Sequence, residues 1–436
     1  MSDSRELPVS LYGTHVGELV SSGGKAILRW SPEAEERWGI NSAVLSRSLR
    51  VSLSSIEHTE SFFGALLPEG RHLDRLATSA KTVSNDLLGL LAHVGADLAG
   101  ALRVGQPRDP TEPQALSLIE VAALLDSASG FLVGGGGSAL PGFQRKLTLT
   151  LQEGRWVRGN GTLPSTHILK PVEAEYRSSV ESEHYVLRIA KHLGLAQFET
   201  WVEEIGELSV LVIERYDRRR TSSGTIERLH QEDAGQALGL PWGGNDKFER
   251  NNPASSLRAV ASLLDVNRSV IDKNRFADRL LLLRYTVLNV AAGNTDAHAK
   301  NFSLLHGDNG RSRLAPFYDA APLALDYDLG TALAMKINGV TQLPEVSIAD
   351  ITAEALSWGL PAADIAETIA DSLERIIEAT RVITASPLIE LHVPGYIRGQ
   401  AQNLAAGKKA RIASPIPLMA MPRLGTPETH EEQAKS

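Results

Sequence analysis

The sequence GNTDAHAKNFSLL at residues 293–305 places an aspartate and an asparagine five positions apart, directly after a long apolar run. A second aspartate, Asp319, follows in the segment PFYDA at 316–320. Phosphoryl transfer from ATP needs a carboxylate that orients the attacking hydroxyl, and an Asn and an Asp that bind magnesium through oxygen. The spacing of Asp296 and Asn301 equals that of the protein-kinase loop H-R-D-x-x-x-x-N. These residue types are also common in ordinary turns, so the alternative interpretation is a structural loop without a catalytic role.

A glycine-rich stretch, GGGGSALPGFQRK at 134–146, precedes LTLTL at 147–151, which alternates as a strand should. Glycine lets a backbone approach phosphate closely, although this stretch is neither a Walker A loop nor G-x-G-x-x-G, and a surface linker is the alternative. Lys170 ends a β-prone run, where kinases place a phosphate-binding lysine; a solvated surface lysine is the competing interpretation. The run LSVLVIE at 208–214 is typical of a buried strand that leads into an adenine-binding hinge.

In this order, the segments resemble those of the HipA-type serine/threonine kinases, the toxins of bacterial HipBA toxin–antitoxin modules. The resemblance covers nearly the whole chain. The matching segments are FFGALLPEG at 62–70, LAHVGADLAGAL at 91–102, LPGFQRK at 140–146, HILKP at 167–171, EHY at 183–185 with AKHLGL at 190–195, ERYDR at 214–218, LHQED at 229–233 and the loop at 293–304.

The resemblance implies an α+β, protein-kinase-like architecture of two lobes, with a mixed N-terminal part, a glycine-rich phosphate loop and a mostly α-helical C-terminal lobe. It implies that Asp296 is the catalytic residue and that Asn301 and Asp319 bind magnesium. The implied ATP-binding residues are Pro141, Gly142, Phe143, Gln144, Arg145, Lys146, Lys170, Glu214, Arg215, Tyr216, His298, Lys300 and Tyr318. Positioning and charge neutralisation are the contributions that phosphoryl transfer requires of a protein.

One position departs from the family pattern. Members often carry a serine three positions before the loop glycine, and its autophosphorylation inactivates some of them. Here that position, counted from Gly142, is Ala139, and Ser138 lies one residue earlier. A phosphate on Ser138 would add about two negative charges where the phosphates of ATP bind, and would oppose ATP binding. Ser138 is therefore a candidate autophosphorylation site, with a plain linker serine as the alternative.

The resemblance also implies ATP and Mg²⁺ as cofactors and a role in growth arrest. Known members phosphorylate aminoacyl-tRNA synthetases, so this class is the first candidate substrate. The implied partner is a HipB-like helix-turn-helix antitoxin, through which operator DNA is mainly contacted. One alternative is a small-molecule phosphotransferase, because aminoglycoside-type kinases share D-x-x-x-x-N and a later Asp; the segments at 62–70 and 229–233 argue against it. The other is a non-catalytic corepressor, against which the filled catalytic positions argue.

The composition of the chain excludes several classes of chemistry and bears on its partners and location. The 436 residues include no cysteine, so disulfides, thiol catalysis and cysteine metal sites are impossible. The net charge of -8 gives no general attraction to nucleic acid, and the basic run 408–411 is interpreted as an exposed helix end or an auxiliary DNA contact. The N-terminus lacks a signal pattern and the apolar runs are too short to span a bilayer, which predicts a cytoplasmic protein without a membrane segment.

The chain is predicted to have four parts: an N-terminal subdomain at 1–129, a nucleotide-binding lobe at 130–227, a helical catalytic lobe at 228–412 and a flexible tail at 413–436. The run RYDRRR at 215–220 is predicted to be a solvated turn, with a phosphate-binding role as the alternative. Helices are predicted at 84–91, 116–127, 179–193, 252–265, 275–292 and 348–380, the last interrupted at Pro361.

Overall fold

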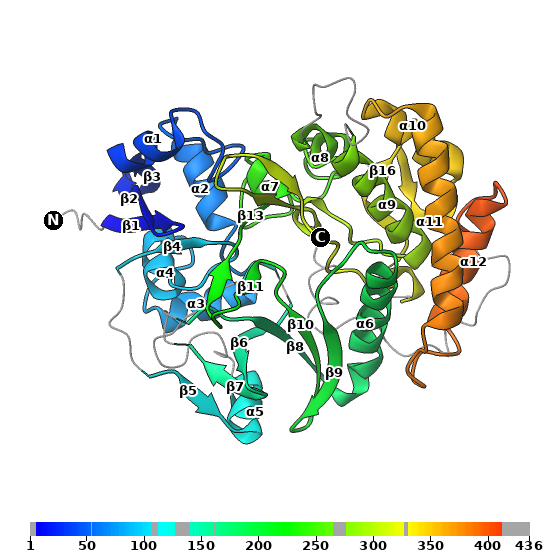
Figure 1. The fold of residues 1–436 in the computed structure, drawn as a ribbon, viewed down its shortest axis with the longest axis horizontal. Coiled ribbons are helices and arrows are strands. Elements are labelled where there is room, and N and C mark those ends of the chain that lie inside the picture. The colour runs from blue at the N-terminus through cyan, green and yellow to red at the C-terminus, as the bar shows by residue number, and fades with distance from the viewer. Residues whose placement is uncertain are drawn as a thin grey trace. The chain divides into compact units, whose positions relative to one another are not determined.

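The computed structural model describes residues 6–53, 55–106, 112–126, 140–142, 144–159, 163–264, 276–326 and 330–411. The chain forms two compact units, each assembled from segments that are distant in the sequence (Figure 1). Unit 1 comprises Met1–Pro171, Glu203–Gly244 and Leu304–Ser312, and unit 2 comprises Val172–Val202, Asn245–Ser303 and Arg313–Ser436.

Unit 1 begins with an antiparallel sheet of order β3-β2-β1-β4. Its hairpins turn at Tyr12-Gly13 and at Gly23-Gly24, where both central residues have positive φ, as two-residue type I′ turns require. Helices α1, α2 and α4 pack on this sheet. The bounds are β1 (Glu6–Leu11), β2 (Thr14–Ser22), β3 (Lys25–Trp30), β4 (Leu102–Val104), α1 (Pro32–Trp38), α2 (Ile56–Gly64), α3 (Arg71–Ser79) and α4 (Leu87–Val94).

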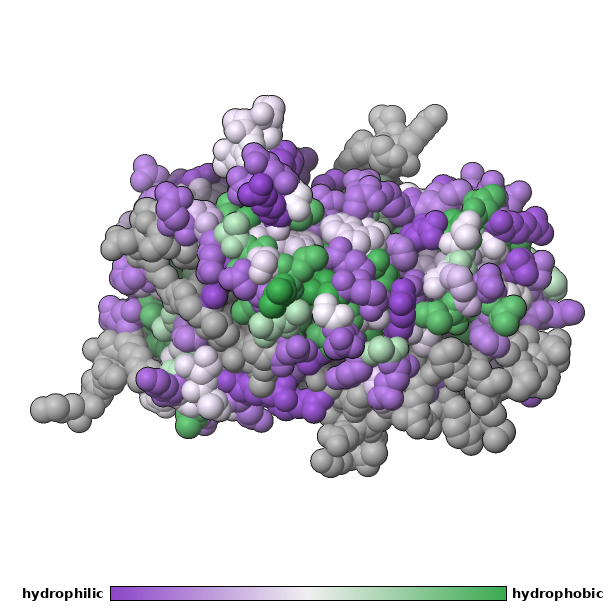
Figure 2. Space-filling model, turned by 90° about the horizontal axis from the view of Figure 1, so that it is seen from below, coloured by the Kyte–Doolittle hydropathy of each residue, from purple (hydrophilic) through white to green (hydrophobic). Residues whose placement is uncertain are grey.

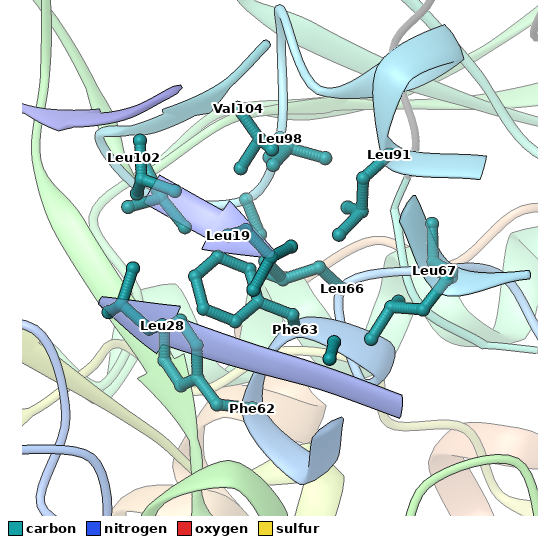
Figure 3. Close-up of a cluster of buried hydrophobic side chains, with 14 of the residues drawn as sticks. Leu19, Leu28, Phe62, Phe63, Leu66, Leu67, Leu91, Leu98, Leu102 and Val104 are labelled. Atoms are coloured by element: carbon teal, nitrogen blue, oxygen red, sulfur yellow. The ribbon is translucent and has the colours of Figure 1, made fainter. Parts of the chain in front are cut away.

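The core of this part is apolar and closely packed, and it contains Phe62, Phe63, Leu66 and Leu67 of the FFGALLPEG segment. The rings of Phe62 and Phe63 meet edge to face at 5.2 Å, and a Cβ added at Gly64 would lie 2.2 Å from the ring of Trp242. Glycine is therefore required there by close packing. Figure 3 shows side chains of this cluster converging from the sheet and the helices: Leu19, Leu28, Phe62, Phe63, Leu66, Leu67, Leu91, Leu98, Leu102 and Val104.

The second sheet carries the candidate nucleotide-binding segments. Its strand order is β5-β7-β6-β8-β10-β9, and β6 pairs with β8 antiparallel with Leu147 opposite Leu169. The strands predicted at 147–151 and 208–214 are confirmed, and the β-prone run at Lys170 forms a strand that continues to Glu173. The bounds are β5 (Gln114–Leu116), β6 (Leu147–Gln152), β7 (Arg155–Arg158), β8 (His167–Glu173), β9 (Thr200–Ile205) and β10 (Leu208–Glu214), with α5 (Leu118–Asp126) nearby in sequence.

Short strands follow, and the prediction of a predominantly helical region at 228–412 omitted those from β13 onward. They are β11 (Arg218–Arg220), β12 (Ile226–Arg228), β13 (His230–Asp233), β14 (Ser303–His306), β15 (Ser312–Leu314), β16 (Ala332–Ile337) and β17 (Val340–Gln342). The short helix α7 (Ala234–Ala237) begins with a capping box, in which Asp233 and Gln236 each accept a backbone N–H of the other. Runs of three or four residues give too little periodicity for a sequence pattern to separate strand from loop.

The longer helices belong to unit 2, where α11 packs against α9 and α12. The predicted break at Pro361 is confirmed, because Pro361 is the N-cap of α11. The helix predicted from residue 252 begins later, at Leu257, because the Ser256 hydroxyl accepts the Ala259 N–H and caps it there. The bounds are α6 (Arg177–His192), α8 (Leu257–Leu263), α9 (Ala277–Ala292), α10 (Ile348–Ser357), α11 (Ala362–Val382) and α12 (Val393–Ala405).

Surface character agrees with the composition. Figure 2 shows hydrophilic residues over most of the visible face, with apolar residues in small patches between them. Within the ranges that the structure describes, no helix is long and apolar enough to cross a bilayer.

Candidate active site

The Asp296 loop is held by its own hydrogen bonds. The Asp296 carbonyl accepts the His298 N–H at 2.7 Å and the Asn301 side-chain N–H at 2.9 Å. Asn301 is the last residue of a short 3₁₀ helix, Ala299–Asn301. Because the amide nitrogen of Asn301 bonds to the loop, its Oδ1 is the atom suited to bind a cation.

A pair of buried amides fixes the start of this loop, and sequence reasoning did not identify it. The Asn294 Nδ2 donates to Asn289 Oδ1 at 2.8 Å, and the Asp296 N–H donates to Asn294 Oδ1 at 3.3 Å. The carbonyl of Thr295 accepts the Ala334 N–H at 2.9 Å. Asn289 is a polar residue within the apolar helix α9, and this sequence feature could have indicated a polar partner such as Asn294.

Gly293 ends α9 in the left-handed conformation, with φ 76°, and a Cβ added there would lie 2.6 Å from the Tyr396 ring. We therefore expect Gly293→Ala to lower the free energy of unfolding by at least about 1 kcal/mol, because backbone strain and the clash act together. The measurement is urea denaturation. The matched control is Gly395→Ala in α12, where a Cβ meets nothing within 4 Å. Equal stability of the two variants would contradict the expectation.

Asp319 lies in a segment that is tied to the Asp296 loop within unit 2. The Tyr318 hydroxyl donates to the Lys300 carbonyl at 2.7 Å and lies 2.7 Å from the Ser303 hydroxyl. Asp319 itself has φ 55°, a conformation that non-glycine residues seldom adopt and that occurs often at functional sites. The hydrogen bonds of Tyr318 thus connect the segment that carries Asp319 to the end of the Asp296 loop.

The two other predicted residues of this loop differ in burial. His298 is buried, and its ring and the Phe248 ring form a T-shaped pair with their centroids 5.3 Å apart. Lys300 is partly exposed, and its carbonyl is the acceptor for Tyr318. Unit 2 thus brings together all the predicted residues of the Asp296 loop and the segment that carries Asp319.

Unit 1 holds the predicted phosphate loop and Lys170. The carbonyl of Gly142 accepts the Glu69 N–H at 3.2 Å, so the LLPEG segment anchors the beginning of this loop. The Lys146 ammonium donates to the Pro141 carbonyl at 2.6 Å. Lys170 is buried on β8. Gln144 and Arg145 are partly buried, whereas Phe143, Ser138 and the four glycines at 134–137 lie outside the described residues.

The predicted hinge follows β10, beside the strand that carries Lys170. Glu214 is exposed, and the Tyr216 hydroxyl donates to Gln231. The Arg215 N–H donates to the Thr166 carbonyl at 2.8 Å, which joins the hinge to the chain just before β8.

The prediction of a solvated turn at 215–220 is wrong for residues 215–218, and only Arg219 and Arg220, on β11, are exposed. Arg215, Asp217 and Arg218 are all buried, and they satisfy one another's charges. The Arg215 guanidinium bonds to both carboxylate oxygens of Asp217, at 2.9 and 2.8 Å, in a bidentate pair that compensates for burial. Because its side chain bonds within the protein, Arg215 can meet a nucleotide only through its backbone.

A family comparison agrees with the fold and with these segments. The sequence profile of the HipA-like C-terminal domain matches residues 138–380, and that of the HipA N-terminal domain matches residues 7–105. The chain belongs to the HipA-like family.

Particular relatives extend along most of the chain. It is 31% identical over 388 residues to the putative kinase Y4mE of Sinorhizobium fredii, covering 83% of this chain and 90% of that protein. It is 27% identical over 365 residues to the serine/threonine-protein kinase toxin HipA of Shewanella oneidensis, covering 81% and 82% respectively. A solved structure of Shewanella oneidensis HipA with HipB and operator DNA superposes with a TM-score of 0.75 at 23% identity, covering 92% of this chain and 96% of that one. The predicted α+β fold is thereby confirmed.

Proposed function

We propose that this chain is an ATP- and magnesium-dependent protein serine/threonine kinase and the toxin of a type II toxin–antitoxin system. The observation that carries the proposal is the geometry of the Asp296 loop. The Asp296 carbonyl accepts the Asn301 side-chain amide at 2.9 Å, and the Tyr318 hydroxyl connects the Asp319 segment to Lys300 of this loop. The names of the relatives, kinase and kinase toxin, support the same class.

In this proposal Asp296 orients the hydroxyl of a serine or threonine in the substrate and accepts its proton. Asn301 and Asp319 hold magnesium, which neutralises charge on the transferred phosphoryl group. Their amide and carboxylate oxygens are the hard ligands that magnesium prefers. In the part of the chain that the structure describes, no cluster of three or more His, Cys, Asp or Glu side chains could hold a metal by itself. The two ligands would therefore need the phosphate oxygens of ATP to complete the site.

The nucleotide-binding roles fall on unit 1. Lys170 would neutralise the phosphates, and the loop Pro141–Lys146 would cover them. The backbone at Glu214–Tyr216 would meet adenine. In unit 2, His298 and Lys300 of the Asp296 loop are also proposed to bind ATP.

We further propose the biological setting by analogy with the Shewanella oneidensis relative, whose solved structure is a complex with HipB and operator DNA. A HipB-like helix-turn-helix antitoxin would neutralise this chain and provide most of the DNA contact, and the protein would act in the cytoplasm. The substrate would be a protein, with aminoacyl-tRNA synthetases as the first class to test. Ser138 is the proposed autophosphorylation site, and the four-part division stays a prediction.

The test uses purified wild type and Asp319→Ala with labelled ATP, magnesium and a cell lysate. We expect label on a lysate protein with wild type only, and its loss when magnesium is chelated, because Asp319 supplies the carboxylate ligand. Label on small alcohols but on no protein would favour a small-molecule phosphotransferase. No ATP turnover despite intact binding of a helix-turn-helix antitoxin would favour a corepressor.

A further inference from the structure

The segment LAHVGADLAGAL at 91–102 resembles the family pattern, but the proposed chemistry gives it no task. In the structure, its turn Asp97–Gly100 meets the hinge within unit 1. Two buried carboxylates, of Asp97 and Asp217, face three buried guanidiniums, of Arg215, Arg218 and Arg228. The hydrogen bond from Arg218 to Asp97 alone joins residues 121 positions apart in the sequence.

Asp97 joins the turn to the segment just before β8 and to the β11–β12 hairpin that follows the hinge. Its Oδ2 accepts the N–H of Ser165 at 3.1 Å and the Ser165 hydroxyl at 2.5 Å. Its Oδ1 lies 3.1 Å from an Arg218 nitrogen and 3.3 Å from an Arg228 nitrogen. Burial alone would raise the pKa of Asp97, but the guanidiniums of Arg228 and Arg218 hold that pKa well below its usual range. The carboxylate is therefore ionised at neutral pH.

The backbone of the turn completes the attachment to the hinge. The Gly100 N–H donates to Asp217 Oδ2 at 2.7 Å, and the Leu98 carbonyl accepts from Arg215 at 3.1 Å and from Arg218 at 2.9 Å. Gly100 has φ 75°, and a Cβ there would lie 2.8 Å from the Gln231 nitrogen. Only glycine allows this close approach without strain.

Ser165 connects the network to the other nucleotide-binding element. Its hydroxyl accepts from Arg215 Nη1 at 2.8 Å while it donates to Asp97. Ser165 lies five residues before Lys170 along the same segment, and the next residue, Thr166, accepts the Arg215 N–H. The network thus fixes the hinge after β10 against the strand that carries Lys170.

We infer that Asp97 is a positioning residue for the nucleotide, which sets ATP affinity by holding the hinge backbone at Glu214–Tyr216 in register with Lys170. The inference rests on the proposed kinase function. A binding site that is held in place before the ligand arrives loses less entropy on binding, so loosening the network weakens affinity without removing any group that contacts ATP.

The experiment measures the dissociation constant of a fluorescent ATP analogue at a temperature below that at which any variant unfolds. The melting temperature of each variant is measured separately. We expect Asp97→Asn to weaken binding by about tenfold, the effect of losing charge-assisted hydrogen bonds. Ser165→Ala keeps every charge and removes one bridge, so a smaller loss in the same direction is expected.

Two further variants separate positioning from a general loss of stability. The wild-type network contains one more guanidinium than carboxylates, and Asp97→Asn alone raises this excess to two. Combining Asp97→Asn with Arg228→Met restores the excess to one and should recover stability. It should not recover affinity, because Ser165 and the turn stay unanchored. Glu227→Gln breaks the exposed ion pair with Arg219 on the β11–β12 hairpin and should leave ATP affinity unchanged.

The outcomes distinguish this inference from the proposed function. Wild type that binds no ATP analogue would overturn the kinase proposal and, with it, the inference. Wild type that binds, with Asp97→Asn and Ser165→Ala folded and binding equally well, would overturn the inference alone. If Asp97→Asn does not fold, Ser165→Ala decides the question by the same criterion.

Discussion

Asp296→Asn is expected to lower kcat for phosphoryl transfer by about 10³-fold, the usual contribution of a positioned general base. The amide has nearly the same shape as the carboxylate but cannot accept the proton of the attacking hydroxyl. The hydrogen bonds from His298 and Asn301 go to the Asp296 backbone carbonyl, so they survive the substitution. The measurement is steady-state transfer from ATP to the substrate found with the wild type, together with the affinity for ATP, which should change little.

A matched substitution in the same unit controls for the loss of a negative charge. Asp371 lies on α11, pairs with Arg284 and has 41% of its side chain exposed. Asp371→Asn should keep kcat near the wild-type value. If Asp296→Asn kept more than about a tenth of the activity, general-base catalysis by Asp296 would be untenable.

His306→Ala is expected to lower the free energy of unfolding by about 3 kcal/mol, because it removes one partner of a fully buried pair. The His306 Nε2 lies 2.9 Å from Glu232 Oε1, and both side chains have no exposed surface. Glu232 also accepts the Ser46 hydroxyl at 2.5 Å and the Arg47 N–H at 2.9 Å, so it joins three segments of unit 1. Without His306, a buried carboxylate would lose one donor and gain a cavity beside it. Denaturant unfolding measures the change.

The chain offers an exposed pair of the same type as a control. His15 and Glu18 lie 3.4 Å apart on β2, with 41% and 34% of their side chains exposed. His15→Ala should change stability by less than about 1 kcal/mol, because water screens the pair and solvates the remaining carboxylate. A loss for His306→Ala no larger than that for His15→Ala would show that the buried pair is not a principal support of unit 1.

Local patterns in the sequence predicted a large part of this protein. Alternation at 147–151 predicted β6, Pro361 predicted the start of α11, and the spacing of Asp296 and Asn301 predicted a loop that the structure closes with a hydrogen bond between them. These features depend on residues a few positions apart, so steric preference and periodicity are enough to indicate them. The roles of these residues in catalysis stay predictions.

Only the tertiary structure determined the environment of the charged and polar groups. A run such as RYDRRR at 215–220 has the composition of a solvated turn, yet Arg218 is buried because it meets Asp97, 121 residues earlier in the chain. The Tyr318 hydroxyl bonds to the Lys300 carbonyl, 18 residues earlier in the chain, which its sequence neighbourhood did not indicate. A charge can be buried only where a partner compensates for its lost hydration, and that partner comes from folding, which brings distant segments together.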